Sequence, residues 1–309
     1  MEKYIEILSR NRTFIMGVAI ISVMLFHQGW LHSYFFKFFC FLGHFGVDIF
    51  FFVSGFGIVY SLKKSDIFSF YKRRIKRIFP PLVLFGVTKY LLAKNVSLFS
   101  NYVVDWKAIF GFDLWYICVI LFFYLISPLL LKIINQRNNG FVPLLIIVFL
   151  IFLGGGYYSL PNTIRWGVVR FPAFLLGMMV ALSRPNLNDK YIRYGIIFVI
   201  FAAVFRLLRH IGLINCTDLF TFLILVFGLP SLCYWLSIVN HFFNNGIASK
   251  CFNYCGVRSL ELYIVHGFVY FGVKQLLIPD MLGFLIGFSL SIVIAEILYQ
   301  TKLKVIKLF

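Results

Sequence analysis

Among the ionisable side chains inside apolar segments long enough to cross a membrane, three stand out: His27, Asp48 and His266. An ionisable group within a bilayer is energetically costly, so each of them is a candidate functional residue. His27 lies near the end of the segment 13–31, and Asp48 lies near the start of the segment 46–62. Because only a short loop joins these two segments, we expect the two side chains to lie close together.

A histidine beside a carboxylate is the arrangement that a general base needs. The carboxylate orients the ring and stabilises its charged form, and the ring accepts a proton from a hydroxyl. The sequence therefore assigns a catalytic role to His27 and Asp48 as a hypothesis. The alternative is an interfacial histidine and an aspartate that caps the second helix. The spacing alone slightly favours that alternative.

Other polar and aromatic residues of the apolar segments are candidates for binding a substrate. Glu261 precedes the mid-segment His266 by five residues, a separation that places the two on different faces of a helix. Arg170 lies in the segment 166–183, where snorkelling to the membrane surface is the alternative. Aromatic rings near the segment ends could line an acceptor pocket, although interfacial anchoring is their more common use. The candidates for substrate binding are Trp115, Tyr116, Arg170, Glu261 and His266.

Residues 63–77, KKSDIFSFYKRRIKR, hold seven positive charges against one negative charge. Such a segment beside a membrane usually sets the orientation of the chain and contacts anionic lipids. The functional alternative is a clamp for phosphate groups, in which Arg73, Arg74 and Arg77 offer bidentate donors. We expect this segment to be a loop. The Pro pair 80–81 should close it and begin the next helix, where a missing N–H costs little.

Helices that cross a bilayer must position all of these residues. Of the 309 residues, 61% are hydrophobic and only 13% are charged, against roughly 25% charged in a soluble domain. Apolar stretches of about 20 residues, the length of a spanning helix, recur along the chain, and a strand barrel would show shorter alternating segments. The sequence predicts an all-α integral membrane protein, a single domain over 1–309 with about ten spans. The spans are expected at 13–31, 46–62, 79–94, 113–133, 141–157, 166–183, 192–208, 219–239, 256–277 and 282–301.

The distribution of positive charge decides the predicted orientation. With the N-terminus in the cytoplasm, most of the 29 Lys and Arg fall on the cytoplasmic side, as the positive-inside rule requires. Both termini are therefore predicted to be cytoplasmic, and the polar segment 95–112 to lie at the outer interface. The rule also accounts for the net charge of +18 without a nucleic-acid partner. The sequence has no phosphate-cradling glycine loop, metal-ligand spacing or nucleophilic serine elbow, so we predict no metal.

Five segments together resemble the acyltransferase 3 family of bacterial membrane proteins. The resemblance covers nearly the whole chain, and the five segments occur in the family's order. They are GVDIFFFVSGF at 46–56, FYKRRIKRIFP at 70–80, LWYICVILFFYLISPLL at 114–130, RFPAFLLGMM at 170–179 and SLELYIVH at 259–266.

The resemblance implies a ten-helix core in the inner membrane that takes an acyl group, usually acetyl, from acyl-coenzyme A at the cytoplasmic face. The acceptor that it implies is a hydroxyl, typically on a sugar of a surface polysaccharide or glycolipid. The family's first-span histidine, which is thought to act in acyl transfer, falls on His27, and its second-span aspartate falls on Asp48. The family's arginine-rich motif falls on Arg73, Arg74 and Arg77.

The chain departs from the family pattern at one position. The family usually has an arginine eleven residues before the histidine, and this chain has Met16 there. Arg12 lies about one turn earlier and about 60° further round the helix from His27. Three interpretations stay open: Arg12 substitutes imperfectly, this member uses a different donor or acceptor contact, or it is weakly active.

Other classes of protein fit the sequence less well. A transporter or flippase of a glycan or lipid precursor is the first alternative, because intramembrane charges also mark substrate pathways, but the paired broken helices of such proteins are not evident. A polysaccharide polymerase usually carries a large outer loop, and a sensor or structural role would suit an inactive relative. For an acyltransferase, the sequence leaves open both direct transfer and a covalent acyl-enzyme.

Overall fold

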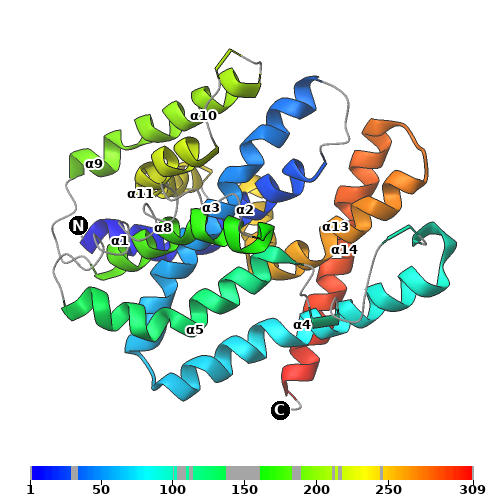
Figure 1. The fold of residues 1–309 in the computed structure, drawn as a ribbon, viewed down its shortest axis with the longest axis horizontal. Helices are drawn as coiled ribbons and strands as arrows, with labels where there is room; N and C mark the ends of the chain where they lie inside the picture. The colour runs from blue at the N-terminus through cyan, green and yellow to red at the C-terminus, as the bar shows by residue number, and fades with distance from the viewer. Residues whose placement is uncertain are drawn as a thin grey trace. The chain divides into compact units, whose positions relative to one another are not determined.

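The computed structural model describes residues 2–28, 34–99, 101–102, 109–110, 114–136, 161–182, 189–210, 213–214, 218–243 and 246–307 (Figure 1). These residues form helices and short connections, with no strand among them. The predicted all-helical class is therefore confirmed for this part of the chain. The helices are α1 (Glu2–Arg10), α2 (Arg12–Phe26), α3 (Tyr34–Lys63), α4 (Ile67–Asn95), the 3₁₀ turn η1 (Ser97–Phe99), α5 (Trp115–Gln136), α8 (Asn162–Leu182), α9 (Asp189–Tyr194), α10 (Ile196–His210), α11 (Asp218–Phe242), α12 (Ile247–Val257), α13 (Ser259–Gln275) and α14 (Asp280–Lys307).

Several of these helices have the length and composition of membrane spans. Among the described residues, six stretches qualify, and the bent pair of α1 and α2 would make a seventh. The predicted span 141–157 lies outside the described residues, and α13 has only 17 residues, or roughly 26 Å at 1.5 Å per residue. A multi-pass membrane protein is supported, whereas ten spans and cytoplasmic termini stay predictions. The six stretches are Phe45–Lys63, Trp115–Ile134, Asn162–Leu182, Asp189–Arg209, Ile224–Phe242 and Asp280–Lys307.

The basic segment is not a loop for most of its length, so that prediction was wrong. Helix α4 begins at Ile67 and continues through Pro80 and Pro81 without interruption. Lys and Arg are good helix formers, and the helix buries Phe70 and Ile78 while Lys72, Arg73 and Arg77 are exposed. The two prolines do not begin the helix but lie inside it, where each removes a backbone hydrogen bond.

The chain forms two compact units. Unit 1 comprises residues 1–15, 47–67 and 119–250, and unit 2 comprises residues 16–46, 68–118 and 251–309. In unit 1, α11 packs against α1, α8, α9 and α10, and Figure 1 shows it beside α10.

Two glycines let α3 and α8 approach closely in unit 1. A Cβ atom on Gly55 would lie 2.0 Å from the carbonyl oxygen of Phe174, and a Cβ on Gly177 would lie 2.0 Å from that of Phe52. No other residue type fits at either position without moving a helix. Small residues at the contact are a common way to bring membrane helices together, and this contact fixes which side chains of α3 and α8 face each other.

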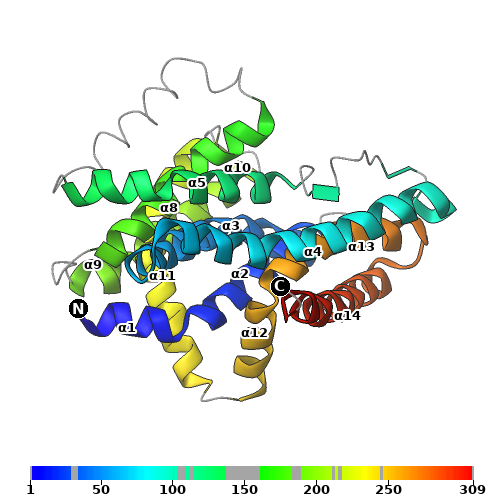
Figure 2. The same cartoon turned by 90° about the horizontal axis from the view of Figure 1, so that it is seen from below.

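Unit 2 holds α13 between several partners. It packs against α14 and against η1, and Figure 2 shows the change of direction between α12 and α13. Helix α2 approaches α12 so closely that a Cβ on Gly17 would lie 1.8 Å from the carbonyl oxygen of Phe252. Because α13 follows α12 directly, this approach fixes the position of the end of α2 relative to α13.

Candidate active site

Two histidines meet in unit 2. His27 follows the last residue of α2 and keeps the helical geometry, since its N–H donates to the carbonyl oxygen of Val23 at 3.2 Å. Its Nδ1 atom lies 3.2 Å from Nε2 of His266, which lies in the middle of α13. The ring centroids are 4.8 Å apart. His266 is 3% exposed, whereas His27 is exposed, so the pair has one buried and one accessible member.

The hydrogen bonds of this pair assign its protons. Nδ1 of His266 lies 2.9 Å from the carbonyl oxygen of Leu262, which only accepts, so Nδ1 carries the proton and Nε2 is the acceptor. Nδ1 of His27 lies 2.9 Å from the carbonyl oxygen of Val23 and faces the acceptor Nε2 of His266. It must therefore be a donor. In the neutral ring this leaves Nε2 of His27 unprotonated, which is the atom that a general base requires.

Aromatic rings extend from the histidine pair along α13. Tyr263 and Tyr270 lie one turn to either side of His266, each with its ring centroid 5.7 Å from the His266 ring. Tyr116 of α5 continues the row, 4.9 Å from Tyr263. All three tyrosines are buried. His266 therefore lies in a largely aromatic environment.

Two buried polar side chains, Gln28 and Tyr270, adjoin the pair. Gln28 is completely buried and Tyr270 is 3% exposed. The amide of Gln28 lies near the hydroxyl of Tyr270, but neither group makes a well-aligned hydrogen bond with any residue that the structure describes. Buried polar groups nearly always have partners. Among the described residues, each of these two groups therefore has the other as its polar neighbour.

The other acidic candidate, Asp48, forms an ion pair in unit 1. Its Oδ1 lies 3.6 Å from Nε of Arg170, and both side chains are almost completely buried. Asp48 lies one turn before Phe52 on α3, and Arg170 lies one turn before Phe174 on α8. The close contact of α3 with α8 therefore brings the Asp48 and Arg170 side chains to the same height along the two helices. Arg206 contributes a second positive charge near Asp48, and the Arg170 guanidinium lies over the ring of Trp166 at 5.1 Å.

We expect Arg170→Leu to lower the free energy of unfolding by about 3–5 kcal/mol, because removing one partner of a buried ion pair leaves an uncompensated charge. Thermal unfolding of the detergent-purified protein measures this. Arg165→Leu is the control, since Arg165 lies on the same helix and is only half-buried. The double variant Asp48→Leu with Arg170→Leu should lose less stability than Arg170→Leu alone. A larger, additive loss would show that the pair is not coupled.

Glu261 also forms a buried ion pair, within unit 2. The ammonium of Lys302, on α14, donates to Oε1 of Glu261 on α13, and lies 4.4 Å from the ring centroid of Tyr299. Glu261 is completely buried and Lys302 is 6% exposed. This pair joins α13 to α14, so the geometry favours a structural role for Glu261 over the predicted contact with a substrate.

The three arginines of the basic segment do not point the same way. Arg73 and Arg77 lie four residues apart on one face of α4, and both are exposed. Arg74 is half-buried, and its guanidinium lies over the ring of the fully buried Phe70 at 5.3 Å. Two of the three predicted phosphate ligands are therefore presented to the solvent, and the third packs against its own helix.

The predicted site residues thus separate into groups. His27, His266, Trp115 and Tyr116 belong to unit 2, whereas Asp48 and Arg170 belong to unit 1. The predicted pairing of His27 with Asp48 joins different units and stays a prediction. The sequence did not indicate a role for three residues that interact with the predicted ones, nor for Gln28, which lies beside one of these three, Tyr270. The three residues are Arg206, Tyr270 and Lys302.

One comparison with known proteins identifies a relationship. A family model described as an acyltransferase domain matches residues 14–300, which include the histidine pair, the Asp48–Arg170 pair and the basic helix. No curated protein and no solved structure matches the chain.

Proposed function

The chain belongs to the acyltransferase 3 family, and from this membership we propose that it is a membrane-bound O-acyltransferase with acyl-coenzyme A as donor and a sugar hydroxyl as acceptor. The acyl group is acetyl, and the sugar belongs to a surface polysaccharide or glycolipid. The protein lies in the inner membrane with both termini in the cytoplasm. The observation that carries the proposal is the histidine pair, whose hydrogen bonds leave Nε2 unprotonated in the neutral ring of the exposed His27.

Acyl transfer needs a base at the attacking hydroxyl, and His27 is our candidate for it. In direct transfer, Nε2 of His27 accepts the hydroxyl proton while the hydroxyl oxygen forms a bond to the thioester carbonyl carbon. The tetrahedral intermediate then collapses, the carbon–sulfur bond breaks, and the thiolate of coenzyme A takes the proton back from His27. His266 accepts a hydrogen bond from Nδ1 of His27 and holds the ring in the productive tautomer throughout.

Asp48 has a separate supporting role in this proposal. Its contacts with Arg170 and the nearby charge of Arg206 support a buried ionic centre that stabilises the packing of α3 against α8. Arg12 also belongs to unit 1, where its guanidinium lies against Gly57 of α3. We therefore assign proton transfer to His27, positioning of its ring to His266, and structural stabilisation to the Asp48–Arg170 pair.

Label transfer tests the proposal. Membranes that contain the chain and membranes of the same host without it are given acetyl-labelled acetyl-coenzyme A, and label is counted in the extracted glycan and glycolipid fractions. We expect label in these fractions only when the chain is present. Label that remains in the donor, or that appears in free acetate alone, would contradict the assignment of a sugar acceptor.

We expect the double variant Arg73→Gln with Arg77→Gln to raise the KM for acetyl-coenzyme A by roughly tenfold or more with kcat unchanged. Each arginine offers a charge-assisted hydrogen bond to phosphate worth about 1.5–3 kcal/mol. Steady-state kinetics measures both constants. The control is Lys63→Gln with Lys64→Gln, which removes two exposed charges of the same basic segment. An equal rise in KM in both double variants would indicate a general effect of charge rather than a phosphate site on α4.

A further inference from the structure

The first half of α4 exposes two opposite kinds of side chain. Phe68 is 76% exposed, Ile75 is 52% exposed and Phe79 is 39% exposed, although all three are large and apolar. Five Lys and Arg lie in the same stretch, at residues 72–77, and the sequence of α4 contains no Asp or Glu. Water is a poor environment for the exposed rings, and the hydrocarbon core is a costly one for the cations. The boundary between the two suits both kinds.

The exposed side chains form separate stripes along the helix. At about 100° per residue, Phe68, Ile75 and Phe79 lie within about 40° of one another and form an apolar stripe. Arg73 and Arg77, both exposed, form a basic stripe about 160° round the helix from the apolar one. A flat surface contacts one side of a helix. A membrane that meets the apolar stripe therefore leaves the basic stripe on the opposite side.

Two lysines border the apolar stripe. Lys72 and Lys76 lie about 40° and about 80° round the helix from Phe68, and Lys72 is exposed whereas Lys76 is half-buried. A lysine in such a place extends its hydrocarbon stem along the lipid and its ammonium group into the head-group region. Positive charge there is complementary to the phosphate groups of anionic lipids. The side of α4 that carries the apolar stripe therefore matches an anionic membrane surface.

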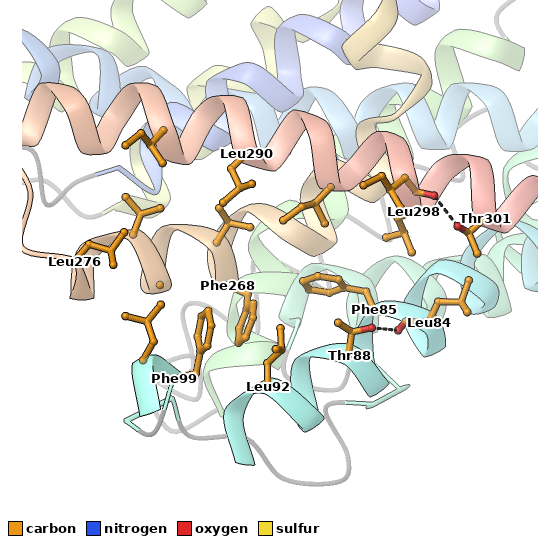
Figure 3. Close-up of a pocket in the computed structure, with 17 residues that line it drawn as sticks. Leu84, Phe85, Thr88, Leu92, Phe99, Phe268, Leu276, Leu290, Leu298 and Thr301 are labelled. Atoms are coloured by element: carbon orange, nitrogen blue, oxygen red, sulfur yellow. Dashed lines mark hydrogen bonds between the residues drawn. The ribbon is translucent and has the colours of Figure 1, made fainter. Parts of the chain in front are cut away.

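The remaining side of α4 holds the helix to the rest of unit 2. Phe70 and Ile78 are buried, on the side of the helix that neither stripe occupies. Beyond the prolines, Phe85 meets Phe268 of α13 edge-on, with the ring centroids 5.9 Å apart. Figure 3 shows Phe85 and Leu92 on the side of α4 that faces Phe268. These contacts prevent the helix from turning about its axis, so the direction of the apolar stripe is fixed.

The length of the apolar stripe indicates how this half of α4 lies. From Phe68 to Phe79 the helix rises about 17 Å, whereas the head-group region is roughly 5–8 Å thick on each side of a bilayer. If the helix followed the membrane normal, Phe79 at the membrane edge would leave Phe68 in bulk water. Phe68 is the most exposed of the three residues. A helix that lies along the surface instead places all three where head groups meet acyl chains.

We propose that residues 68–79 bind the surface of a membrane leaflet that contains anionic phospholipid. The apolar stripe enters the leaflet, and Lys72 and Lys76 contact the lipid phosphates. Arg73 and Arg77 face the aqueous phase. The lipid contact and the phosphate clamp then occupy different sides of one helix. Lipid binding follows from exposure and charge alone, whereas the use of the basic stripe for the donor's phosphates rests on the proposed function.

Fluorescence quenching in nanodiscs locates the apolar stripe. The full-length Phe68→Trp variant is placed in discs of phosphatidylcholine with a minority of phosphatidylglycerol, with or without bromine on all acyl chains. The signal is the difference from wild-type protein in the same discs. Arg77→Trp puts the same reporter on the basic stripe. We expect bromine to lower the Phe68→Trp signal by about half or more and to leave the Arg77→Trp signal nearly unchanged. Equal quenching of both variants, or of neither, would overturn the proposal.

Two sets of discs with identical lipid composition test the head group. Bromine is carried by the phosphatidylglycerol alone in one set, and by an equal amount of the phosphatidylcholine in the other. We expect brominated phosphatidylglycerol to quench Phe68→Trp at least about twofold more strongly. Adding Lys72→Gln with Lys76→Gln should abolish this difference. Adding Lys94→Gln with Lys274→Gln, which removes two exposed lysines elsewhere in unit 2, should preserve it. Equal quenching in the two sets, or loss of the difference in both lysine pairs, would overturn the anionic preference.

Kinetics separates the lipid contact from the donor site. Lys72→Gln with Lys76→Gln should leave the KM for acetyl-coenzyme A unchanged, whereas Arg73→Gln with Arg77→Gln should raise it. A similar rise in both double variants would overturn the division of α4 into two functional sides. Quenching needs no donor. The expected quenching without any acetyl transfer would therefore support the lipid contact and refute the proposed function alone.

Discussion

The His27→Ala variant is expected to transfer acetyl groups at a rate lower than that of the wild type by roughly a hundredfold to ten-thousandfold, the usual contribution of a general base. The physical reason lies in the proton positions. Nδ1 of His27 carries the ring proton and donates it to the Val23 carbonyl oxygen and to Nε2 of His266. Nε2 of His27 is therefore the atom that accepts a proton. Alanine removes this base and leaves the α2 backbone in place. The measurement is label transfer from acetyl-coenzyme A to the glycan fraction.

Two controls make that result specific. His241→Ala makes the same substitution at an exposed position of α11 and should retain wild-type activity. Membrane insertion of His27→Ala should also be normal, as judged by extraction and by thermal unfolding in detergent. If correctly inserted His27→Ala keeps more than about a tenth of the wild-type rate, a factor that corresponds to only about 1.4 kcal/mol of barrier, His27 is not the base.

Much of the fold could be predicted because membrane-spanning helices appear in the sequence as long apolar stretches. The predicted spans 219–239 and 282–301 fall within α11 and α14, and the described part of 113–133 overlaps α5 from Trp115 onward, each a nearly uninterrupted apolar stretch. Breaks inside a span were harder to predict. Arg258 separates α12 from α13 within the predicted span 256–277, and the residues around it remain compatible with a continuous helix, so composition alone does not reveal the break.

The start of α4 was mispredicted for a related reason. Charge density distinguishes a membrane-embedded residue from an exposed one, but it does not distinguish a loop from an exposed helix. The segment around Arg73 and Arg77 is exposed and helical at once. The proline pair strengthened the wrong interpretation, because proline is common in the first turn of a helix and rare in its interior.

Individual residues of the candidate site could be predicted from the sequence, but the contacts between residues on different helices could not. Helical periodicity relates residues within one helix, so the positions of Tyr263 and Tyr270 beside His266 follow from spacings of three and four. It gives no information on the contact of His266 with His27, which are 239 positions apart in the sequence. That contact depends on the closeness of α2 to α12 at Gly17, and nothing in a single sequence shows which glycine marks a helix crossing.

His266→Leu is expected to lower kcat by roughly tenfold to a hundredfold while the KM for acetyl-coenzyme A stays unchanged. In the transition state the His27 ring gains positive charge, so the hydrogen bond from its Nδ1 to Nε2 of His266 becomes charge-assisted, worth about 1.5–3 kcal/mol, and each 1.36 kcal/mol corresponds to a factor of ten in rate. The loss should be smaller than at His27, because the Val23 carbonyl still accepts from Nδ1.

A second substitution separates this positioning role from simple packing. His266→Gln keeps an acceptor oxygen at about the position of Nε2, whereas leucine fills similar space with no acceptor. If His266 acts by holding the His27 tautomer, glutamine should restore most of the kcat that leucine loses. If His266 only packs between Tyr263 and Tyr270, leucine should be tolerated at least as well as glutamine, since it places no additional polar group in a buried site. Single-turnover rates for the two variants therefore rank in opposite orders under the two explanations, and the order does not depend on which sugar is the acceptor.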